Sequence, residues 1–202
     1  DQQVAIKVIR RNIFSATTHE QFANERRILA RLHHPHIAHL LDGGVSEDGS
    51  PYIIMELIKG VPITDYVEAQ DLDLAARLAL FRDACNALEY AHRELVVHAD
   101  VKPSNVVVAE GFGVKLLDFG LAKVLPSPDS RSEGATTAVT GTTAGLVLGT
   151  LDYMSPEQVR GLDVDRRTDI FSFGVVLYQM ITGRLPFAGT STTCGGSASH
   201  LP

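Results

Sequence analysis

The stretch VVHADVKPSNVVV, from Val96 to Val108, constrains the fold of this chain more than any other part of the sequence. Its polar residues, His98 to Asn105, lie between two runs of valine. Valine favours β-strands because its branched side chain packs well on a pleated sheet. A polar run beside a strand predicts a loop at the edge of a sheet. Such a loop can direct several polar side chains into one cleft.

A second polar cluster follows the same pattern. Two short strands, Val106–Ala109 and Val114–Leu117, are predicted on either side of the turn EGFG, and the second leads directly into Asp118. An amphipathic helix from Leu74 to about His92 is predicted before the first loop. Its apolar residues are three or four positions apart: Leu74, Leu78, Phe81, Cys85 and Leu88.

The first part of the chain combines strands with one helix. Val4 to Ile9 and Pro51 to Ile58 are rich in β-branched residues and predict two strands. Between them, Thr17 and Glu20 have the spacing of a capping box, and a helical apolar pattern continues as far as Pro35. Glu25 falls on or beside the apolar side of this helix, where a carboxylate requires a cationic partner.

Composition excludes several classes of protein. The chain has 202 residues, of which 45% are hydrophobic, so it is long enough to bury a core and is not expected to be disordered. Its formal charge of −6 argues against nucleic acid as the main partner. Cys85 and Cys194 match no metal-ligand spacing, which favours a reducing compartment.

Membrane and targeting segments are not expected in this sequence. The longest apolar run, Ile170 to Ile181, is too short to span a bilayer and instead predicts a buried helix. No signal-peptide pattern follows Asp1, and the missing initial Met indicates a fragment. We therefore expect a cytoplasmic location, and leave open a membrane tether in regions outside this chain.

The polar residues together suit phosphoryl transfer. Asn105 and Asp118, together with Asp100, offer the hard oxygen ligands that Mg²⁺ takes when it also binds substrate phosphates. Lys102 adds a positive charge beside them, which suits a phosphoryl group in transfer. Lys7 on the first strand is a candidate for a second phosphate-binding ammonium, held by the helix carboxylate described above.

Five motifs, VAIK, HADVKPSN, DFG, GTLDYMSPE and RTDIFSFG, occur in one order along the chain. This ordered set resembles the eukaryotic-type Ser/Thr protein kinases that are also found in bacteria, over about Val4 to Phe187. The resemblance implies an α+β, two-lobed fold with a small β-rich lobe and a large helical lobe, both partial. The implied domains are residues 1–58 and 59–188, followed by an unpatterned tail at 189–202.

The resemblance also assigns roles to residues of the site. It implies ATP and Mg²⁺ as cofactors and a protein as the substrate, and it leaves the oligomeric state open. The implied catalytic residues are Asp100 as the base that orients the substrate hydroxyl, Lys102 beside the transferring phosphate, and Thr150, which bonds both. The implied phosphate and metal contacts are Lys7 with its partner Glu25, and Asn105 with Asp118.

The implied adenine pocket is apolar. Met55 resembles the residue at its back, and the backbone from Glu56 to Ile58 resembles the hinge that hydrogen-bonds the base. Ala5 and Val107 resemble its roof and floor. Each of these side chains is equally well explained as part of the core, so their assignment depends on the resemblance alone. Asp65, which opens the next helix, is read as a helix cap.

The sequence departs from the kinase pattern at Ala99, where most relatives have an Arg that receives a phosphate on the activation segment. We expect phosphorylation there to order the segment only weakly, unless Lys123 replaces the Arg. The candidate acceptors are Thr136, Thr137, Thr140, Thr142 and Thr143. The glycine-rich phosphate loop of the family is not in this sequence, and neither is a helical pattern after Phe187.

Alternatives remain at three places. The first is function, for which a nucleotide-binding module without turnover is the main rival. A small-molecule phosphotransferase is a weaker rival, because such enzymes lack a segment like GTLDYMSPE. The second is the cluster from His33 to Ile37, which is read as a helix-to-strand connection rather than a metal site. The third is Asp169, which resembles a buried anchor for the catalytic loop and also suits a helix N-terminus.

Overall fold

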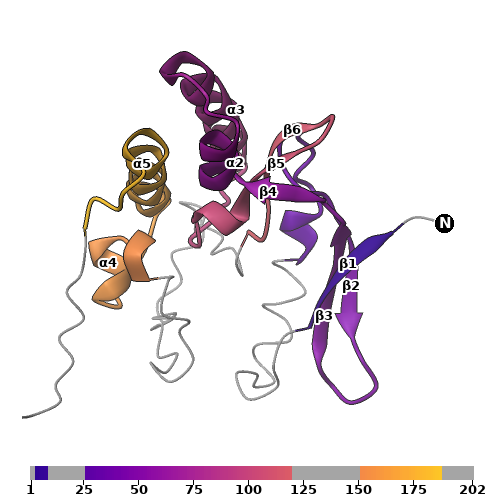
Figure 1. The fold of residues 1–202 in the computed structure, drawn as a ribbon. Helices are drawn as coiled ribbons and strands as arrows, with labels where there is room; N and C mark the ends of the chain where they lie inside the picture. Colours follow the sequence, from indigo (N-terminus) through magenta and orange to yellow (C-terminus); the bar gives the residue numbers. More distant parts are fainter. Residues whose placement is uncertain (1–2, 9–25, 120–150, 188–202) are drawn as a thin grey trace, which may run out of the picture.

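A computed structural model describes residues 3–8, 26–119 and 151–187 of the chain. The elements alternate between two small sheets and a set of helices (Figure 1). In chain order they are β1 (Val4–Val8), β2 (Leu40–Val45), β3 (Pro51–Glu56), β4 (Gly60–Pro62), α2 (Ile63–Ala69), α3 (Leu74–Arg93), the 3-10 turn η2 (Pro103–Asn105), β5 (Val106–Ala109), β6 (Gly113–Leu116), η3 (Leu151–Tyr153), α4 (Pro156–Val159) and α5 (Arg166–Thr182).

The first sheet is antiparallel and has the order β1-β3-β2. The predicted strands at Val4–Ile9 and Pro51–Ile58 form β1 and β3, each slightly shorter than expected. Strand β2 was not predicted from the sequence, because its Asp-Gly-Gly segment resembles a turn. Pairing with β3 overrides that local preference, and a Cβ at Gly43 would lie only 2.8 Å from the carbonyl oxygen of Tyr52.

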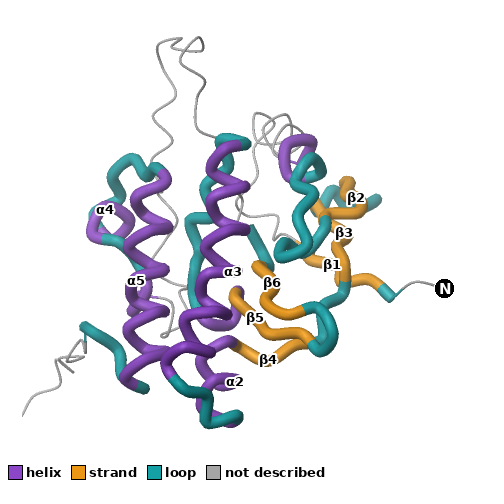
Figure 2. Tube along the Cα trace, turned by 90° about the horizontal axis from the view of Figure 1, so that it is seen from above, coloured by secondary structure: helices purple, strands orange, loops and turns teal. Residues whose placement is uncertain are grey.

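The second sheet has the order β4-β5-β6 and carries the predicted hairpin. Strand β5 has the predicted bounds, and β6 begins one residue earlier than expected, at Gly113. A parallel bridge between Ile37 and Leu116 joins this hairpin to the segment that leads into β2. The end of β6 therefore lies close to the first sheet, as the view from above also shows (Figure 2).

Helix α3 is confirmed, but its buried face differs from the prediction. Leu74 and Leu78 are exposed, whereas the fully buried positions include the alanines 84, 87 and 91. Small side chains allow the helix to approach its neighbours closely, and the ring of Phe81 lies 5.5 Å from that of Phe173 on α5. Close packing through alanine therefore decides the buried face here, rather than the largest apolar residues.

Helix α5 begins after an Asp165 cap and ends at Gly183, whose φ of 69° is left-handed. Phe173 and Met180 are buried, but Ile170 is 60% exposed and Ile181 is also exposed. The prediction of a buried helix is therefore right for one face and wrong for the other. Within the described parts of the chain, no helix combines the length and hydrophobicity needed to cross a bilayer.

Only the end of the helix predicted between Thr17 and Pro35 lies in the described part of the chain. Residues 26–29 are helical, and Leu29 and Leu32 join the core beneath the first sheet. The capping-box residues Thr17 and Glu20 lie outside the described residues. So do the loop predicted from Leu125 to Thr150 and the tail after residue 188.

Candidate active site

The loop between α3 and η2 brings three predicted site residues together. Both carboxylate oxygens of Asp100 contact the Lys102 ammonium, at 3.1 Å and 2.9 Å. The amide nitrogen of Asn105 donates to Asp100 twice, to the backbone oxygen at 2.8 Å and to Oδ2 at 2.9 Å. Residues separated by five positions therefore form one polar cluster, in which Asn105 is buried and Asp100 is partly open to solvent.

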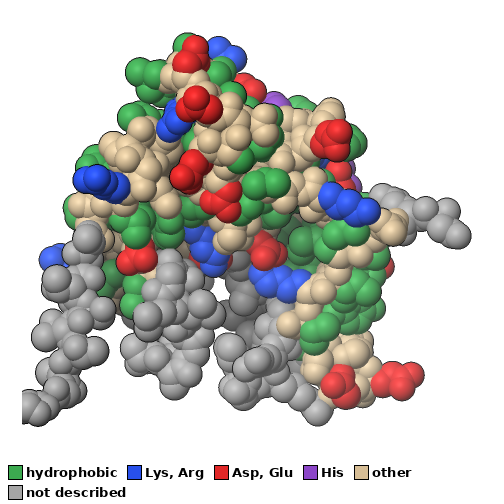
Figure 3. All heavy atoms as spheres, viewed as in Figure 1, with side chains coloured by type: hydrophobic (Ala, Val, Ile, Leu, Met, Phe, Trp, Pro, Cys, Tyr) green, Lys and Arg blue, Asp and Glu red, His purple; other side chains and the backbone are tan. Residues whose placement is uncertain are grey.

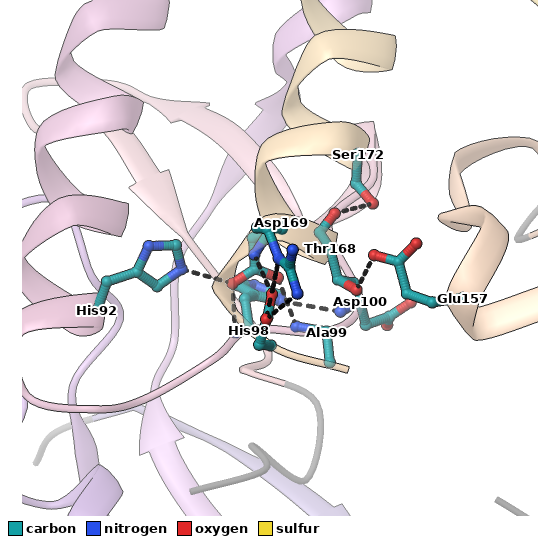
Figure 4. A network of polar contacts seen from close by, with 10 residues as sticks. His92, His98, Ala99, Asp100, Glu157, Thr168, Asp169 and Ser172 are labelled. Atoms are coloured by element: carbon teal, nitrogen blue, oxygen red, sulfur yellow. Dashed lines mark hydrogen bonds and ion pairs between the residues drawn. The ribbon is translucent and has the colours of Figure 1, made fainter. Parts of the chain in front are cut away.

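Asp169, the first-turn carboxylate of α5, anchors this loop from behind (Figure 4). It is fully buried and accepts the backbone N–H groups of His98 at 2.8 Å and Ala99 at 2.7 Å. His92 on α3 contributes a third contact, with Nε2 2.8 Å from Asp169 Oδ2. One carboxylate thus joins α3, α5 and the loop, which is the anchoring contact expected from the sequence, although the His92 contact was not anticipated.

His98 is completely buried and acts as a spacer within the loop. Its Nε2 lies 2.9 Å from the Leu117 carbonyl oxygen, and the Asp100 backbone N–H donates to Nδ1 at 3.3 Å. This pattern fits a neutral ring protonated at Nε2. Burial lowers the pKa of His98 below its ordinary 6.5, against the opposing effect of Asp169. The ring also lies 4.5 Å from the ring of Phe119.

Lys7 and Asp118 meet across the two sheets. The ammonium of Lys7 on β1 lies 3.0 Å from Oδ1 of Asp118, which follows β6. Asp118 has a left-handed φ of 49°, which costs free energy for a residue with a Cβ and turns the chain sharply after the strand. The predicted partner of Lys7, Glu25, lies outside the described residues, so the pair with Glu25 stays a prediction.

The oxygen atoms around Asn105 and Asp118 suit Mg²⁺. Because the Asn105 amide nitrogen is occupied by Asp100, its amide oxygen is directed away from that carboxylate. The Leu117 backbone N–H donates to the Asn105 carbonyl oxygen at 2.8 Å, which places the residue before Asp118 next to Asn105. Carboxylate and amide oxygens are hard ligands, and Mg²⁺ is commonly held by one or two protein ligands together with substrate phosphates.

The residues assigned to the adenine pocket lie on strands of both sheets. Ala5 and Met55 are register partners across β1 and β3, and Val107 is buried in the middle of β5. The Glu56 carboxylate binds elsewhere: it accepts from the His39 backbone N–H at 3.2 Å and lies 3.2 Å from the Lys115 ammonium. The side chain of Glu56 therefore supports the strand end. Ile58 lies two positions after Glu56, in the connection to β4, and its side chain is partly buried.

Ser155 starts a polar chain on the other side of the loop, at the beginning of α4. It is buried, and its Oγ lies 3.1 Å from Oγ1 of Thr168. Thr168 in turn donates to Glu157 at 2.8 Å (Figure 4). Ser155 and Gln158 form a capping box. Gln158 also donates from Nε2 to the Ala99 carbonyl oxygen at 2.7 Å.

The contacts of Gln158 and His92 were not predicted from the sequence. Neither residue belongs to a motif whose side chain has an expected partner, because each contact crosses between distant segments of the chain. The only available signal was the Ser155-to-Gln158 spacing of a capping box, which predicts a helix start but gives no information about contacts with the loop.

Some residues to which the sequence assigned a role lie outside the described parts of the chain, and one has a different role. Thr150 and the five candidate phosphorylation threonines lie outside the described residues. Asp65 is not a cap, because α2 is preceded by Pro62 and Asp65 lies within the first turn, where it accepts from the Thr64 hydroxyl at 3.0 Å. Over residues 3–8, 26–119 and 151–187, no three His, Cys, Asp or Glu side chains are grouped to hold a metal ion.

Charge around the site is mixed rather than of one sign. Figure 3 shows acidic and basic side chains next to each other where the helices meet the first sheet, and hydrophobic side chains on that sheet. The contacts Lys7–Asp118 and Lys102–Asp100 account for two such pairs, with all four side chains partly accessible. Exposed ammonium groups beside carboxylates can exchange partners with a charged ligand at modest cost.

The family model described as protein kinase domain matches residues 1–198 of the chain. The chain is 38% identical over 196 residues to the serine/threonine-protein kinase PknB of Mycolicibacterium smegmatis, covering 94% of this chain and 30% of that protein. It is also 38% identical over 207 residues to the serine/threonine-protein kinase pkn3 of Myxococcus xanthus, covering 100% of this chain and 36% of that protein. The chain thus spans about a third of the length of these relatives.

Proposed function

The chain belongs to the protein kinase domain family, and on that premise we propose that its parent protein transfers the γ-phosphoryl group of ATP to Ser or Thr hydroxyls of proteins. The observation that carries this proposal is the cluster of Asp100, Lys102 and Asn105, with contacts of 2.8 to 3.1 Å. The mixed α+β fold is that of the family.

Asp100 is the group that orients the substrate in this proposal. Its carboxylate is partly accessible, so an incoming hydroxyl can donate to it, while Asn105 and Lys102 fix its orientation. Lys102 then exchanges part of its contact with Asp100 for the transferring phosphate, whose negative charge it offsets. Thr150 is proposed to bond both residues.

Lys7 and Asp118 are proposed to hold the phosphates and the metal. Lys7 binds the α- and β-phosphates, and Glu25 holds its ammonium in place. Asn105 and Asp118 would hold Mg²⁺, which when bound would offset the negative charge of the phosphates. The adenine base lies between Ala5 and Val107, with Met55 behind it, and takes its hydrogen bonds from the backbone between Glu56 and Ile58.

Serine and threonine are preferred to tyrosine for two reasons. Lys102 is followed by Pro103, which is the loop form of Ser/Thr kinases, and the relatives reported above carry serine/threonine in their names. The rival function is a nucleotide-binding module without turnover. A cytoplasmic location for the catalytic part stays a prediction.

The test uses the complete natural protein with [γ-³²P]ATP, Mg²⁺ and a generic protein substrate, followed by phosphoamino-acid analysis. We expect phosphoserine and phosphothreonine from the unsubstituted protein. Asp100→Asn should lower kcat by about a hundredfold or more and leave the Kd for ATP within about twofold, because the change removes the proton acceptor and keeps the shape. Mainly phosphotyrosine, or near-normal turnover by Asp100→Asn, would contradict the proposal. ATP binding without turnover by the unsubstituted protein would favour the rival.

A further inference from the structure

Ala99, directly before Asp100, has a left-handed backbone with a φ of 58°. For a residue with a Cβ this conformation is unfavourable, because Cβ approaches the following carbonyl oxygen. Such a backbone persists only where the surrounding contacts hold it. The orientation of the peptide between Ala99 and Asp100 therefore depends on what holds Ala99.

Both polar backbone groups of Ala99 are held by side chains from other elements. Its N–H donates to Asp169 Oδ1 at 2.7 Å, from the start of α5. Its carbonyl oxygen accepts from Gln158 Nε2 at 2.7 Å, from α4. The methyl side chain has no polar group of its own, so among the described residues these two hydrogen bonds are the ones that hold Ala99.

The orientation of the Gln158 amide follows from its two partners. Its Oε1 accepts from the Ser155 backbone N–H at 3.0 Å, and its Nε2 donates to the Ala99 carbonyl. In the reversed orientation, the Gln158 NH₂ group would face the Ser155 N–H and its oxygen would face the Ala99 carbonyl oxygen. Only the stated orientation of the amide therefore forms both hydrogen bonds. Ser155 is itself held by the Gln158 backbone N–H at 3.3 Å and by Thr168.

There is little room for water beside this contact. The hollow that Ala99, Asp100 and Gln158 help to line measures about 10 Å³, which is at the lower limit for a single water molecule. Loss of the Gln158 donor without a gain in space would therefore leave the Ala99 carbonyl without a hydrogen-bond donor, which is costly for a partly buried group.

We propose that Gln158 is a positioning residue for the phosphoryl-transfer reaction: its amide holds the Ala99–Asp100 peptide in the left-handed turn and joins α4 to the catalytic loop. This inference rests on the proposed function. The Gln158 amide acts through the backbone of Ala99, and the carboxylate that contacts the substrate is that of Asp100.

The decisive variant is Gln158→Glu in the complete natural protein. A Glu at this position still accepts from the Ser155 N–H, so the capping box of α4 is kept. Its second oxygen faces the Ala99 carbonyl and cannot donate while it is ionised. We expect kcat to fall by about tenfold at pH 8, equivalent to about 1.4 kcal/mol, with the Kd for ATP unchanged.

The pH profile separates positioning from a general structural role. A protonated Glu can donate to the Ala99 carbonyl, so the ratio of variant to unsubstituted kcat should rise between pH 8 and pH 5, as the carboxyl approaches its ordinary pKa of about 4.3. The matched control is Gln179→Glu on α5, where the side chain accepts from the Tyr153 hydroxyl at 2.6 Å. A Glu there keeps the acceptor, so kcat should stay within about twofold at every pH.

A second comparison places Gly at position 99. Gly adopts a positive φ without penalty, so Gln158→Glu should cost less in an Ala99→Gly background than in the natural one. An equal loss in both backgrounds, a loss that does not change with pH, or an unchanged kcat would each overturn the inference.

Hydrogen exchange gives a readout that does not require turnover. The amides of residues 98–101 should exchange faster in Gln158→Glu than in the unsubstituted protein, and unchanged rates would refute the positioning role. An unsubstituted protein without kinase activity would instead refute the proposed function, while the exchange data would still decide whether Gln158 holds the loop.

Discussion

At the scale of single residues, His98 shows how burial turns a titratable side chain into a fixed spacer. Its ring bridges the Leu117 carbonyl and the Asp100 N–H, and burial lowers its pKa. The unfolded chain therefore binds a proton below about pH 6.5 that the folded chain does not bind. Folding stability is complete above that pH and decreases as the pH falls through 6.5.

We expect the His98 ring signals in an NMR titration to begin to change only below pH 6.5, because burial lowers the pKa of the folded ring below that value. The free energy of unfolding in urea should fall from pH 7.5 to pH 5.5, by at most about 1.4 kcal/mol per pH unit for this one group. His34 contributes in the same direction, since burial, His36 and Lys115 lower its pKa. A His34→Gln background isolates His98, and a His98 ring that titrates at 6.5 or above would contradict the expectation.

At the scale of an element, α5 presents two neighbouring carboxylates with different roles at its start. Asp169 is fully buried and accepts two loop N–H groups, whereas the partly exposed Asp165 caps the helix and pairs with Arg167. Asp169→Asn should destabilise the domain by about 2 to 4 kcal/mol, because His98 and Ala99 donate to different oxygens of the carboxylate and Asn would place an NH₂ donor against one of these N–H groups.

Asp165→Asn is the matched control on the same helix. Asn caps helices as well as Asp does, and exposed ion pairs contribute little, so its cost should be about 0.5 kcal/mol or less. Urea titration of the domain, followed by far-UV circular dichroism, measures both changes. Equal costs for the two variants would show that burial of Asp169 does not matter to the fold.

At the scale of the whole molecule, the sequence predicts most elements because their signals are local. The strands around Val4, Pro51 and Val106 follow from β-branched runs, α3 follows from helical periodicity, and α5 follows from the apolar run between Ile170 and Ile181. Strand β2 does not, because its Gly-Gly segment is stabilised only by pairing with β3. The buried alanine face of α3 depends in the same way on its neighbours.

In the candidate site too, contacts between residues close in sequence were predictable, and contacts between distant segments were not. Asp100, Lys102 and Asn105 lie five positions apart or less, and motif spacing was enough to group them. Contacts that cross the fold, such as His92 with Asp169 and Gln158 with Ala99, have no local signal. Such contacts depend on how α3, α4 and α5 pack, which no short pattern encodes.

The Lys7–Asp118 ion pair, with an N–O distance of 3.0 Å, makes the proposed phosphate and metal ligands competitors for each other. ATP alone would draw Lys7 away and leave a carboxylate beside the phosphates, and Mg²⁺ alone would leave an unpaired ammonium. When ATP and Mg²⁺ bind together, the phosphates would take the place of Asp118 beside Lys7, and Mg²⁺ would take the place of Lys7 beside Asp118. Their affinities should therefore be reciprocally coupled, typically by about 5- to 150-fold.

Calorimetric titration of ATP at several Mg²⁺ concentrations measures this coupling. Lys7→Met removes the competing ammonium, so the dependence of ATP affinity on Mg²⁺ should become weaker, whereas adenosine, without phosphates, should bind independently of Mg²⁺ in both proteins. A coupling factor that Lys7→Met leaves unchanged would mean that the pair plays no part in it. With the pair intact, nucleotide without metal would be held poorly, and the protein would discriminate in favour of the metal-loaded form before any chemistry begins.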